Sequence, residues 1–367
     1  MVTQAQLNSI YMVNLQCLPD GSAPTLWTSY SSSAMLAAFQ NATSLGFNTV
    51  RIVLLPSTFG FPSPSAPLLA NLTDACNQAV AAGVKLHITM IWYWSPTAEI
   101  GQVSGTKTFM TAIMGAVLAS NLPVTNNLAT TGAYFETYNE GRYGDTTDNY
   151  AGTYDGGYPG STSPPQTIGT VMTNWSRVIT PWLRTLPTPG GGGGFTNATN
   201  CLVTLSCTNT GGTPGQATDL TAAVAAFSGA QIPDWYEWHS YPYGGIPGFM
   251  ADMNAALSAV NGTAPLFIGE TGSTLHNGPN NQKDYLQNAR YSAQQLGLGE
   301  PAPWVLYDPS GTTLTTAYGL YDVNGVARPA VGLYQGLPPG TAVPQLGSAR
   351  WFSVSSDRGR VAARVEA

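Results

Sequence analysis

The amino-acid sequence predicts an α/β fold, a (β/α)8 barrel, from three observations: the chain length, the alternation of two kinds of segment, and the number of repeats. The chain has 367 residues, of which 43% are hydrophobic, so it can bury a large core. Short apolar runs alternate with longer segments of helical periodicity, which is typical of βα units on a parallel sheet. We count eight such units, a number that favours a closed barrel over an open doubly wound sheet.

The apolar runs give the positions of the expected strands. They are 10–16, 49–55, 84–92, 132–139, 200–207, 234–241, 264–270 and 302–308. The expected helices lie near 31–45, 67–82, 106–120, 166–186, 217–228, 247–260, 280–296 and 327–335. A single barrel runs to about 250 residues and reaches about 400 with insertions, so the length does not require a second domain. We expect the barrel to occupy residues 1–336, and residues 337–367 to form a short tail with a hairpin about Asp357 to Gly359.

The loops between these elements are unequal in length. Segment 141–165 follows the fourth strand and is long and rich in Gly, Tyr and Asp. It therefore belongs to the elaborated C-terminal face, where barrels of this kind build their active sites. The run Pro189 to Gly194 precedes the fifth strand, so it lies on the opposite face and is expected to be a flexible connector.

The composition excludes several classes of partner. Only 9% of the residues are charged, the net charge is -6, and no Lys/Arg cluster could follow a phosphate backbone, so no nucleic acid is expected. No apolar stretch is long enough for a membrane span. The four cysteines are too sparse for a disulfide framework, no CxxC pair suggests a metal site, and the redox compartment stays open.

The wealth of Gly, Pro, Ser, Thr, Asn, Tyr and Trp is common in secreted proteins that bind neutral, hydroxyl-rich ligands. The opening residues MetValThrGlnAla contain neither a basic region nor an apolar stretch, so we identify no signal peptide in this sequence. We expect a secreted or extracellular protein that is a monomer.

Two glutamates end two different predicted strands. The fourth strand ends at Asn139 and Glu140, and the seventh ends at Gly269 and Glu270. Hydrolysis of a glycosidic bond with retention needs one carboxylic acid to protonate the leaving oxygen and a second carboxylate to attack the anomeric carbon, at about 5 to 5.5 Å separation. Two glutamates at the mouth of one barrel could provide this pair, although each could also be an ordinary carboxylate of the rim.

The ordered set of strand-end motifs resembles that of clan A glycoside hydrolases, nearest in pattern to families 5 and 39. The matching pieces are MetValAsn14Leu on the first strand, LeuGlyPheAsnThrValArg51Ile on the second, Asn139Glu140 on the fourth, His239SerTyr241 on the sixth, IleGlyGlu270 on the seventh and Trp304 on the eighth. The passage LeuTyrAspValAsnGlyValAlaArgProAla, ending at Ala330, is similar to the one that leads into the last helix of these enzymes. The AsnGlu pair alone is weak evidence, but the ordered set covers nearly the whole barrel.

The resemblance implies a retaining hydrolase that cleaves a β-linked oligo- or polysaccharide by double displacement through a covalent glycosyl-enzyme. Glu140 would be the general acid/base and Glu270 the nucleophile. The nucleophile must be held ionised and oriented, and Arg51 and the Tyr241 hydroxyl are suitable charge-assisted donors. Arg51 could alternatively be an ion-pair partner in the core.

Two further positions receive a role from the same resemblance. Asn139 can donate a hydrogen bond to the sugar 2-OH, a contact that strengthens in the transition state. His239 would lie near Glu140 and set its environment, although it could alternatively be an ordinary buried histidine. Family 5 also expects a histidine near the end of the third strand, whereas His87 lies early in that strand. We therefore interpret His87 as structural.

Aromatic residues at the predicted strand ends are candidates for sugar subsites, because aromatic rings stack on the apolar faces of pyranoses. Trp92, Trp94 and Tyr243 are such candidates, although any one of them could belong to the core. On the eighth strand either Trp304 or Tyr307 could form the platform beneath the reacting sugar, and we favour Trp304.

The period-two alternation of strands places more carboxylates inside the barrel. Glu136 shares a strand face with Glu140, and Glu237 shares one with His239. A buried carboxylate needs a partner, and Arg51 is one candidate. We interpret Glu136 and Glu237 as a structural polar layer beneath the site rather than as catalytic groups.

Other functions have less support. A serine hydrolase is disfavoured because no GxSxG occurs, and a zinc hydrolase because the three histidines form neither HExxH nor HxH, so we expect no metal and no cofactor. The main rival is a carbohydrate-binding barrel without catalysis, in a secreted or viral assembly, and the presence of both carboxylates argues against it. The sequence leaves open the sugar, the linkage, and endo or exo action.

Overall fold

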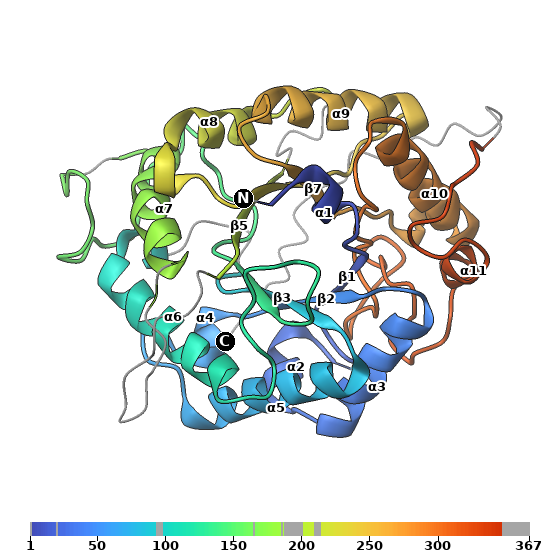
Figure 1. Ribbon diagram of the computed structural model, residues 1–367, viewed down its shortest axis with the longest axis horizontal. Coiled ribbons are helices and arrows are strands. Elements are labelled where there is room, and N and C mark those ends of the chain that lie inside the picture. The colour runs from blue at the N-terminus through green and yellow to red at the C-terminus, as the bar shows by residue number, and fades with distance from the viewer. Residues whose placement is uncertain are drawn as a thin grey trace.

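A computed structural model describes residues 2–19, 21–92, 98–163, 166–184, 186, 201–208 and 214–346. Seven parallel strands form one sheet whose spatial order follows the chain. The strands are β1 (Met12–Leu15), β2 (Thr49–Val53), β3 (Lys85–Thr89), β4 (Ala133–Glu136), β5 (Val203–Thr208), β6 (Trp235–His239) and β7 (Leu266–Glu270). The sheet curves into a barrel inside a ring of helices, which confirms the predicted fold class (Figure 1).

Each of the eight predicted helical segments contains a helix. These are α3 (Ser32–Ser44), α5 (Ala66–Ala82), α6 (Val103–Leu118), α7 (Ile168–Arg184), α8 (Thr218–Ala226), α9 (Gly245–Val260), α10 (Pro279–Gln295) and α11 (Pro329–Gly336). Three short helices are additional: α1 (Gln4–Leu7), α2 (Ala23–Thr28) and α4 (Pro56–Phe59). They are too short to show a helical period, and a capping box or an early proline initiates each of them. Short 3₁₀ turns occur at η1 (Ala98–Gly101), η2 (Gly229–Gln231) and η3 (Leu275–Asn277).

The eighth predicted strand, 302–308, lies in the expected place but does not form a regular strand. The Ala302 amide donates to the Ile268 carbonyl of β7 (3.0 Å), and the Leu306 amide donates to the Asn14 carbonyl of β1 (2.8 Å). The segment therefore bridges β7 and β1 and closes the barrel. Pro303 has no N–H, so it can only accept, as it does from the Asn14 amide (3.3 Å), and a continuous ladder cannot form.

The interior of the barrel is layered along its axis. At the amino ends of the strands lies an apolar plug. Its members Met12, Tyr134, Trp235 and Phe267 are each at most 2% exposed. Helix α1 covers this end, where the Gln4 side chain hydrogen-bonds the backbone of β7. Charged side chains lie above the plug, and aromatic residues lie above the charged ones. The plug removes water from one side of the charged layer, which strengthens its electrostatic interactions.

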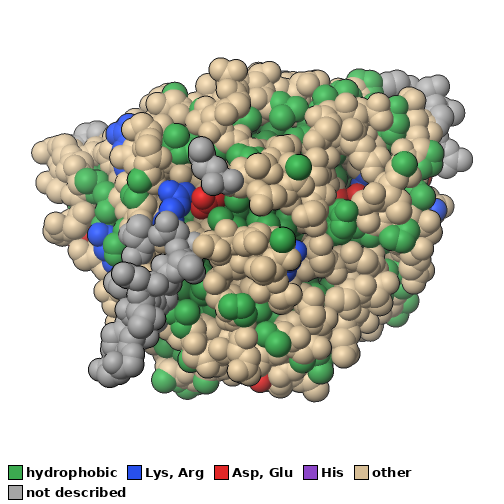
Figure 2. Space-filling view, viewed as in Figure 1, with side chains coloured by type: hydrophobic (Ala, Val, Ile, Leu, Met, Phe, Trp, Pro, Cys, Tyr) green, Lys and Arg blue, Asp and Glu red, His purple; other side chains and the backbone are tan. Residues whose placement is uncertain are grey.

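The described part of the tail packs on α10. Gln287 donates to the Pro344 carbonyl (3.0 Å) and Gln294 to the Thr341 carbonyl (2.6 Å). The expected hairpin about Asp357 to Gly359 and the connector at 189–194 lie outside the described residues, and the domain boundary stays a prediction. Within the described ranges, no helix is both long and apolar enough to cross a bilayer. Few charged side chains appear on the face shown in Figure 2.

Candidate active site

The guanidinium of Arg51 is the centre of the polar layer. It projects from β2 into the barrel and is fully buried. Its Nε and Nη2 donate to Glu136 Oε2 (2.9 and 2.6 Å), and Nη2 also donates to Asn139 Oδ1 (2.7 Å). Its Nη1 donates to Asn14 Oδ1 (2.9 Å) and to Glu270 Oε1 (2.5 Å). Five donors thus have five bonds, which compensates the burial of a charge.

Glu270, at the end of β7, contacts three polar side chains. Besides Arg51, the Tyr241 hydroxyl donates to Oε2 (2.8 Å), and His239 Nδ1 lies 3.3 Å from Oε1. Burial raises the pKa of Glu270, while the charges of His239 and Arg51 and the Tyr241 hydrogen bond oppose this rise. Both predicted donors therefore contact the carboxylate that they were expected to hold.

Glu140 lies just beyond β4 in a left-handed backbone conformation, with φ at 52°. A non-glycine residue adopts this region only where its surroundings hold it, and here the Glu140 amide donates to Ser206 Oγ of β5 (2.8 Å). This turn directs the side chain to His239, whose Nδ1 lies 3.0 Å from Glu140 Oε1. The two carboxylates share this one nitrogen, and ligand atoms of Glu140, His239 and Glu270 all lie within 4.8 Å of one another.

His239 joins the two carboxylates from β6. Burial alone would lower its pKa, but the carboxylates of Glu270 and Glu140 outweigh burial and raise the pKa above the ordinary histidine value. Asn139 is fixed differently, because Arg51 holds its amide oxygen. The NH₂ end of that amide is then available to donate to a ligand. His239 thus contacts Glu140, and Asn139 contacts Arg51.

The aromatic candidates differ in their placement. The rings of Trp92 and Trp304 stack at 6.3 Å between centroids, in an apolar cluster above the polar layer. Tyr307 instead receives a hydrogen bond from Asn41 of α3, so its ring belongs to the helix layer. Of the two alternatives on the eighth segment, Trp304 is therefore the residue beside the site. Tyr243 is half-buried in the turn after β6, and no ring contact among the described residues includes it.

Trp94 lies outside the described residues. Sequence reasoning missed Tyr318, which follows the eighth segment in an irregular stretch. Its ring meets that of Tyr241 edge-on, with centroids 6.2 Å apart, and packs against the cluster that contains Trp304. No periodicity marks this position, and only the folded chain brings it to the site.

The polar layer beneath the site holds two glutamates in opposite states. Burial favours the protonated form of both, but the Arg51 charge lowers the pKa of Glu136 to about 2, and Thr89 Oγ1 also donates to this carboxylate (2.5 Å). Glu237 makes no such ion pair, and burial together with the Glu136 charge raises its pKa to about 8. Arg51 is therefore the partner of Glu136, whereas Glu237 accepts from Trp235 Nε1 (3.0 Å).

His87 lies deep in this layer rather than at the mouth. Its Nδ1 is 3.2 Å from the Met12 sulfur and its Nε2 is 3.4 Å from Glu237 Oε1. Complete burial lowers its pKa to about 3, so it is neutral. This placement agrees with its interpretation as structural. The clustered acids and histidines have the ligand types of a cation site, but the Arg51 guanidinium already neutralises charge there, and we assign no metal to them.

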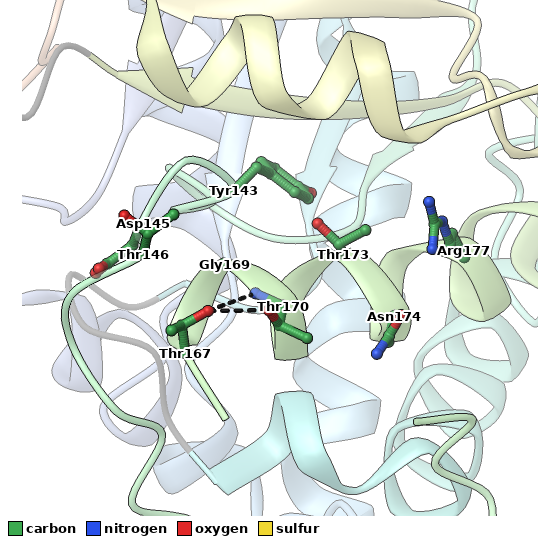
Figure 3. Close-up of a pocket in the computed structure, with 9 residues that line it drawn as sticks. All are labelled: Tyr143, Asp145, Thr146, Thr167, Gly169, Thr170, Thr173, Asn174 and Arg177. Atoms are coloured by element: carbon green, nitrogen blue, oxygen red, sulfur yellow. Dashed lines mark hydrogen bonds between the residues drawn. The ribbon is translucent and has the colours of Figure 1, made fainter. Parts of the chain in front are cut away.

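A separate groove of about 270 Å³ lies between the segment after β4 and α7. Hydroxyl groups of four threonines line much of it, and Figure 3 shows Thr173, Asn174 and Arg177 projecting into view from the helix. It contains none of the predicted site residues. The strand-end cluster, rather than this groove, is the candidate active site.

No protein-family model matches the chain, and a search of curated proteins finds no match. Among solved structures, an exo-β-1,4-mannosidase from Opitutaceae bacterium strain TAV5 is similar at a TM-score of 0.61 and 15% identity, over 89% of this chain and 59% of the mannosidase. GH5_18 from Streptomyces cattleya is similar at a TM-score of 0.64 and 13% identity, over 90% and 80% of the two chains.

A glycoside hydrolase family 17 β-1,3-glucanosyltransferase from Rhizomucor miehei is similar at a TM-score of 0.52 and 13% identity, over 89% and 98% of the two chains. The expected resemblance to family 5 is confirmed for the fold. This chain spans less than two thirds of the length of the mannosidase. The similarity therefore concerns the fold and does not extend to the activity of the mannosidase.

The close approach of β6 and β7 at Gly269 generates the first prediction. A Cβ added there would lie 2.3 Å from Glu237 Oε2 and 3.2 Å from His239 Nε2. We expect Gly269→Ala to force the polar layer apart and to lower the free energy of unfolding by about 1 to 3 kcal/mol. Chemical denaturation measures this change.

Gly115→Ala, inside α6, is the matched control, because a Cβ there meets nothing within 4 Å. Alanine is the better helix former by about 0.5 to 1 kcal/mol, so the control should be neutral or stabilising. An unfolding midpoint of Gly269→Ala equal to that of the wild type would contradict the close contact.

Proposed function

We propose that this protein is a retaining β-glycosidase in which Glu140 is the general acid/base and Glu270 the nucleophile. The observation that carries the proposal is the pair of strand-end carboxylates that share His239, with ligand atoms of all three residues within 4.8 Å. Retention needs carboxyl groups about 5 to 5.5 Å apart, whereas inversion needs about 6.5 to 9.5 Å to admit a water molecule. The observed proximity favours retention.

In the first step Glu270 attacks the anomeric carbon while Glu140 gives its proton to the leaving oxygen. The bonds from Arg51 and Tyr241 orient the Glu270 carboxylate before the sugar arrives, so no reorganisation is needed at the moment of attack. In the second step Glu140 takes a proton from water, and that water displaces Glu270 from the sugar. His239 contacts both carboxylates and can stabilise the negative charge as it passes between them.

The surroundings of the pair support a sugar ligand. Asn139 offers its NH₂ group to the 2-OH, and Trp304 beside Trp92 offers an aromatic platform. Trp94 and Tyr243 remain proposed subsite residues. Proteins of similar fold include a β-1,4-mannosidase and a β-1,3-glucanosyltransferase, so we propose a β-linked oligo- or polysaccharide as substrate. The composition, poor in charge and rich in Gly, Ser, Thr, Asn and Tyr, suits a neutral glycan as ligand, and we propose a secreted or extracellular monomer.

The second prediction assigns the two glutamates by their chemistry. Glu140→Ala should still be glycosylated by an activated aryl β-glycoside, because a good leaving group needs little protonation. Added azide needs no general base, so it should restore turnover and give a β-glycosyl azide. Glu270→Ala should be inactive with good and poor leaving groups alike, and azide should give the α-azide by direct displacement. Proton NMR of the azide product reads the stereochemistry.

Wild type without azide is the control, and it should release the chromophore while retaining configuration. The opposite pair of azide products would show that the two roles are reversed. Full activity in both variants would place the catalytic site elsewhere. No release by the wild type across a panel of aryl β-glycosides would favour a carbohydrate-binding barrel without catalysis.

The third prediction is a pH dependence. Burial raises the pKa of Glu270 above the ordinary glutamate value of about 4.3. Attack requires the ionised form, so kcat/KM for an activated aryl glycoside should fall as the pH drops through this raised pKa. The acid limb should therefore lie above about pH 4.3.

Tyr241→Phe tests the cause of this limb. It removes a hydrogen bond that stabilises the ionised carboxylate, so the acid limb should move to still higher pH. Tyr307→Phe alters a hydroxyl in the helix layer and should leave the limb in place. An unchanged limb in Tyr241→Phe would mean that Glu270 does not control it.

A further inference from the structure

Several buried polar atoms beneath the candidate pair have no hydrogen bond within the part of the chain that the structure describes. Glu136 Oε1 and His87 Nε2 are among them, and so are Oε2 of Glu237 and Nε2 of His239, on fully buried side chains of β6. The other oxygen of Glu237 is occupied, since it accepts from Trp235 Nε1 (3.0 Å) and lies 3.4 Å from His87 Nε2. Buried polar groups in folded proteins are nearly always satisfied, so each remaining atom calls for an explanation.

The two β6 atoms lie against the same point of the neighbouring strand. A Cβ on Gly269 would be 2.3 Å from Glu237 Oε2 and 3.2 Å from His239 Nε2, so the glycine leaves room for both. Ligand atoms of Glu136, Glu237 and His239 lie within 4.8 Å of one another. The carboxyl of Glu237 and the ring of His239 are therefore close enough to exchange a proton directly after a small rotation or through one bridging water.

The other ring nitrogen fixes which tautomer is present. Nδ1 of His239 faces Glu140 Oε1 at 3.0 Å and Glu270 Oε1 at 3.3 Å, and the Glu270 carboxylate, which must be ionised to attack, can only accept. Nδ1 must therefore carry a hydrogen, and any second proton of the ring must come and go at Nε2. The Nε2 atom lies beside Gly269, as Glu237 Oε2 does.

Charges around the two groups bring their proton affinities together. Burial and the Glu136 charge raise the pKa of Glu237 to about 8, and the Glu270 and Glu140 charges raise the pKa of His239. The titratable or charged groups that face this pair from the neighbouring strands are Arg51, His87, Tyr134, Glu136, Glu140, Glu270 and Tyr241. With these neighbours a proton can reside on either partner.

We propose that Glu237 is a positioning residue that shares one proton with His239, between Oε2 and Nε2, and so keeps Nδ1–H directed at both catalytic carboxylates. In one state Glu237 is a neutral acid and His239 a neutral ring. In the other the proton has moved from Oε2 to Nε2, which leaves a carboxylate and an imidazolium. The count of protons is the same in both states, and Nδ1 keeps its hydrogen throughout.

This sharing would serve the proposed reaction, on which its catalytic consequence rests. When Glu140 gives its proton to the leaving oxygen, it becomes negative beside His239. Movement of the proton from Glu237 to Nε2 then supplies an imidazolium beside that new charge. When Glu140 takes a proton from water, the shared proton returns to Glu237. A negative charge is thus moved deeper into the barrel without any group leaving its place.

The test is nitrogen-15 NMR of histidine-labelled protein, followed over a pH titration. The chain has three histidines, so the His239 signals can be assigned by comparison with His276→Gln and His87→Gln. In Glu237→Gln the amide donates to Nε2 but cannot become an anion, so the imidazolium loses its partner. We expect the His239 midpoint to fall by about one pH unit or more, with hydrogen kept on Nδ1.

Asp252→Asn is the matched control, since it also changes a buried carboxyl to an amide against β6. Asp252 accepts from Trp238 Nε1 (2.8 Å) and Ser240 Oγ (2.6 Å). The Asp252→Asn substitution should leave the midpoint of the His239 titration unchanged. If Glu237→Gln does not fold, Trp235→Phe removes a donor that favours the Glu237 anion and should lower the midpoint in the same direction. A His239 midpoint and tautomer that match the wild type in a folded variant would overturn the proposal.

Kinetics separate this proposal from the proposed function. The NMR titration needs no substrate, so a shifted midpoint supports proton sharing even if the wild type hydrolyses no glycoside. If the wild type is a glycosidase, Glu237→Gln should also move the acid limb of kcat/KM to higher pH, because a less charged His239 stabilises the Glu270 anion less. Glycosidase activity with an unshifted midpoint would leave the function standing and remove Glu237 from it.

Discussion

The buried guanidinium of Arg51 is the interaction on which the rest of the site depends. A charge in the barrel interior is tolerated only when each of its donors is matched, and Arg51 finds its acceptors on several strands. The partners Asn14, Glu136 and Glu270 belong to β1, β4 and β7, so one planar group sets the relative position of distant strand ends. Loss of one partner of such a pair typically costs about 3 to 5 kcal/mol.

The layers of the barrel explain why equal residue types behave differently. The apolar plug keeps water from the polar layer, so burial favours the neutral form of each titratable group there, and the nearby charges decide whether this effect is overcome. Glu136 touches Arg51 and is held ionised, whereas Glu237 does not and is held neutral near physiological pH. Two buried glutamates of the same layer therefore differ in protonation state, a difference that the sequence does not reveal.

What could be predicted from the sequence follows from the same physics. Parallel strands bring their carboxyl ends together, so Glu140 and Glu270 could be placed at one mouth from their positions at strand ends, and the family resemblance assigned Arg51 to Glu270. The irregularity of the eighth segment was not predicted: Pro303 removes a donor from its ladder, although the segment keeps its position in the ring. Tyr318 was missed since it reaches the site from an irregular segment, and the sequence could not decide which of Glu136 and Glu237 Arg51 would pair with, because that depends on side-chain positions in the folded barrel.

The hydrogen bonds of Arg51 are shared between the carboxylates of Glu136 and Glu270, and this sharing has a chemical consequence. Glu136 accepts two of its hydrogen bonds, whereas Glu270 accepts one and relies on Tyr241 and His239 for the remainder. A carboxylate that accepted the whole guanidinium would be stabilised so strongly that it would be a weak nucleophile. Glu136 takes up most of the positive charge, so Glu270 is oriented by Arg51 without being fully neutralised. The structural carboxylate beneath the site thereby tunes the carboxylate that is proposed to react.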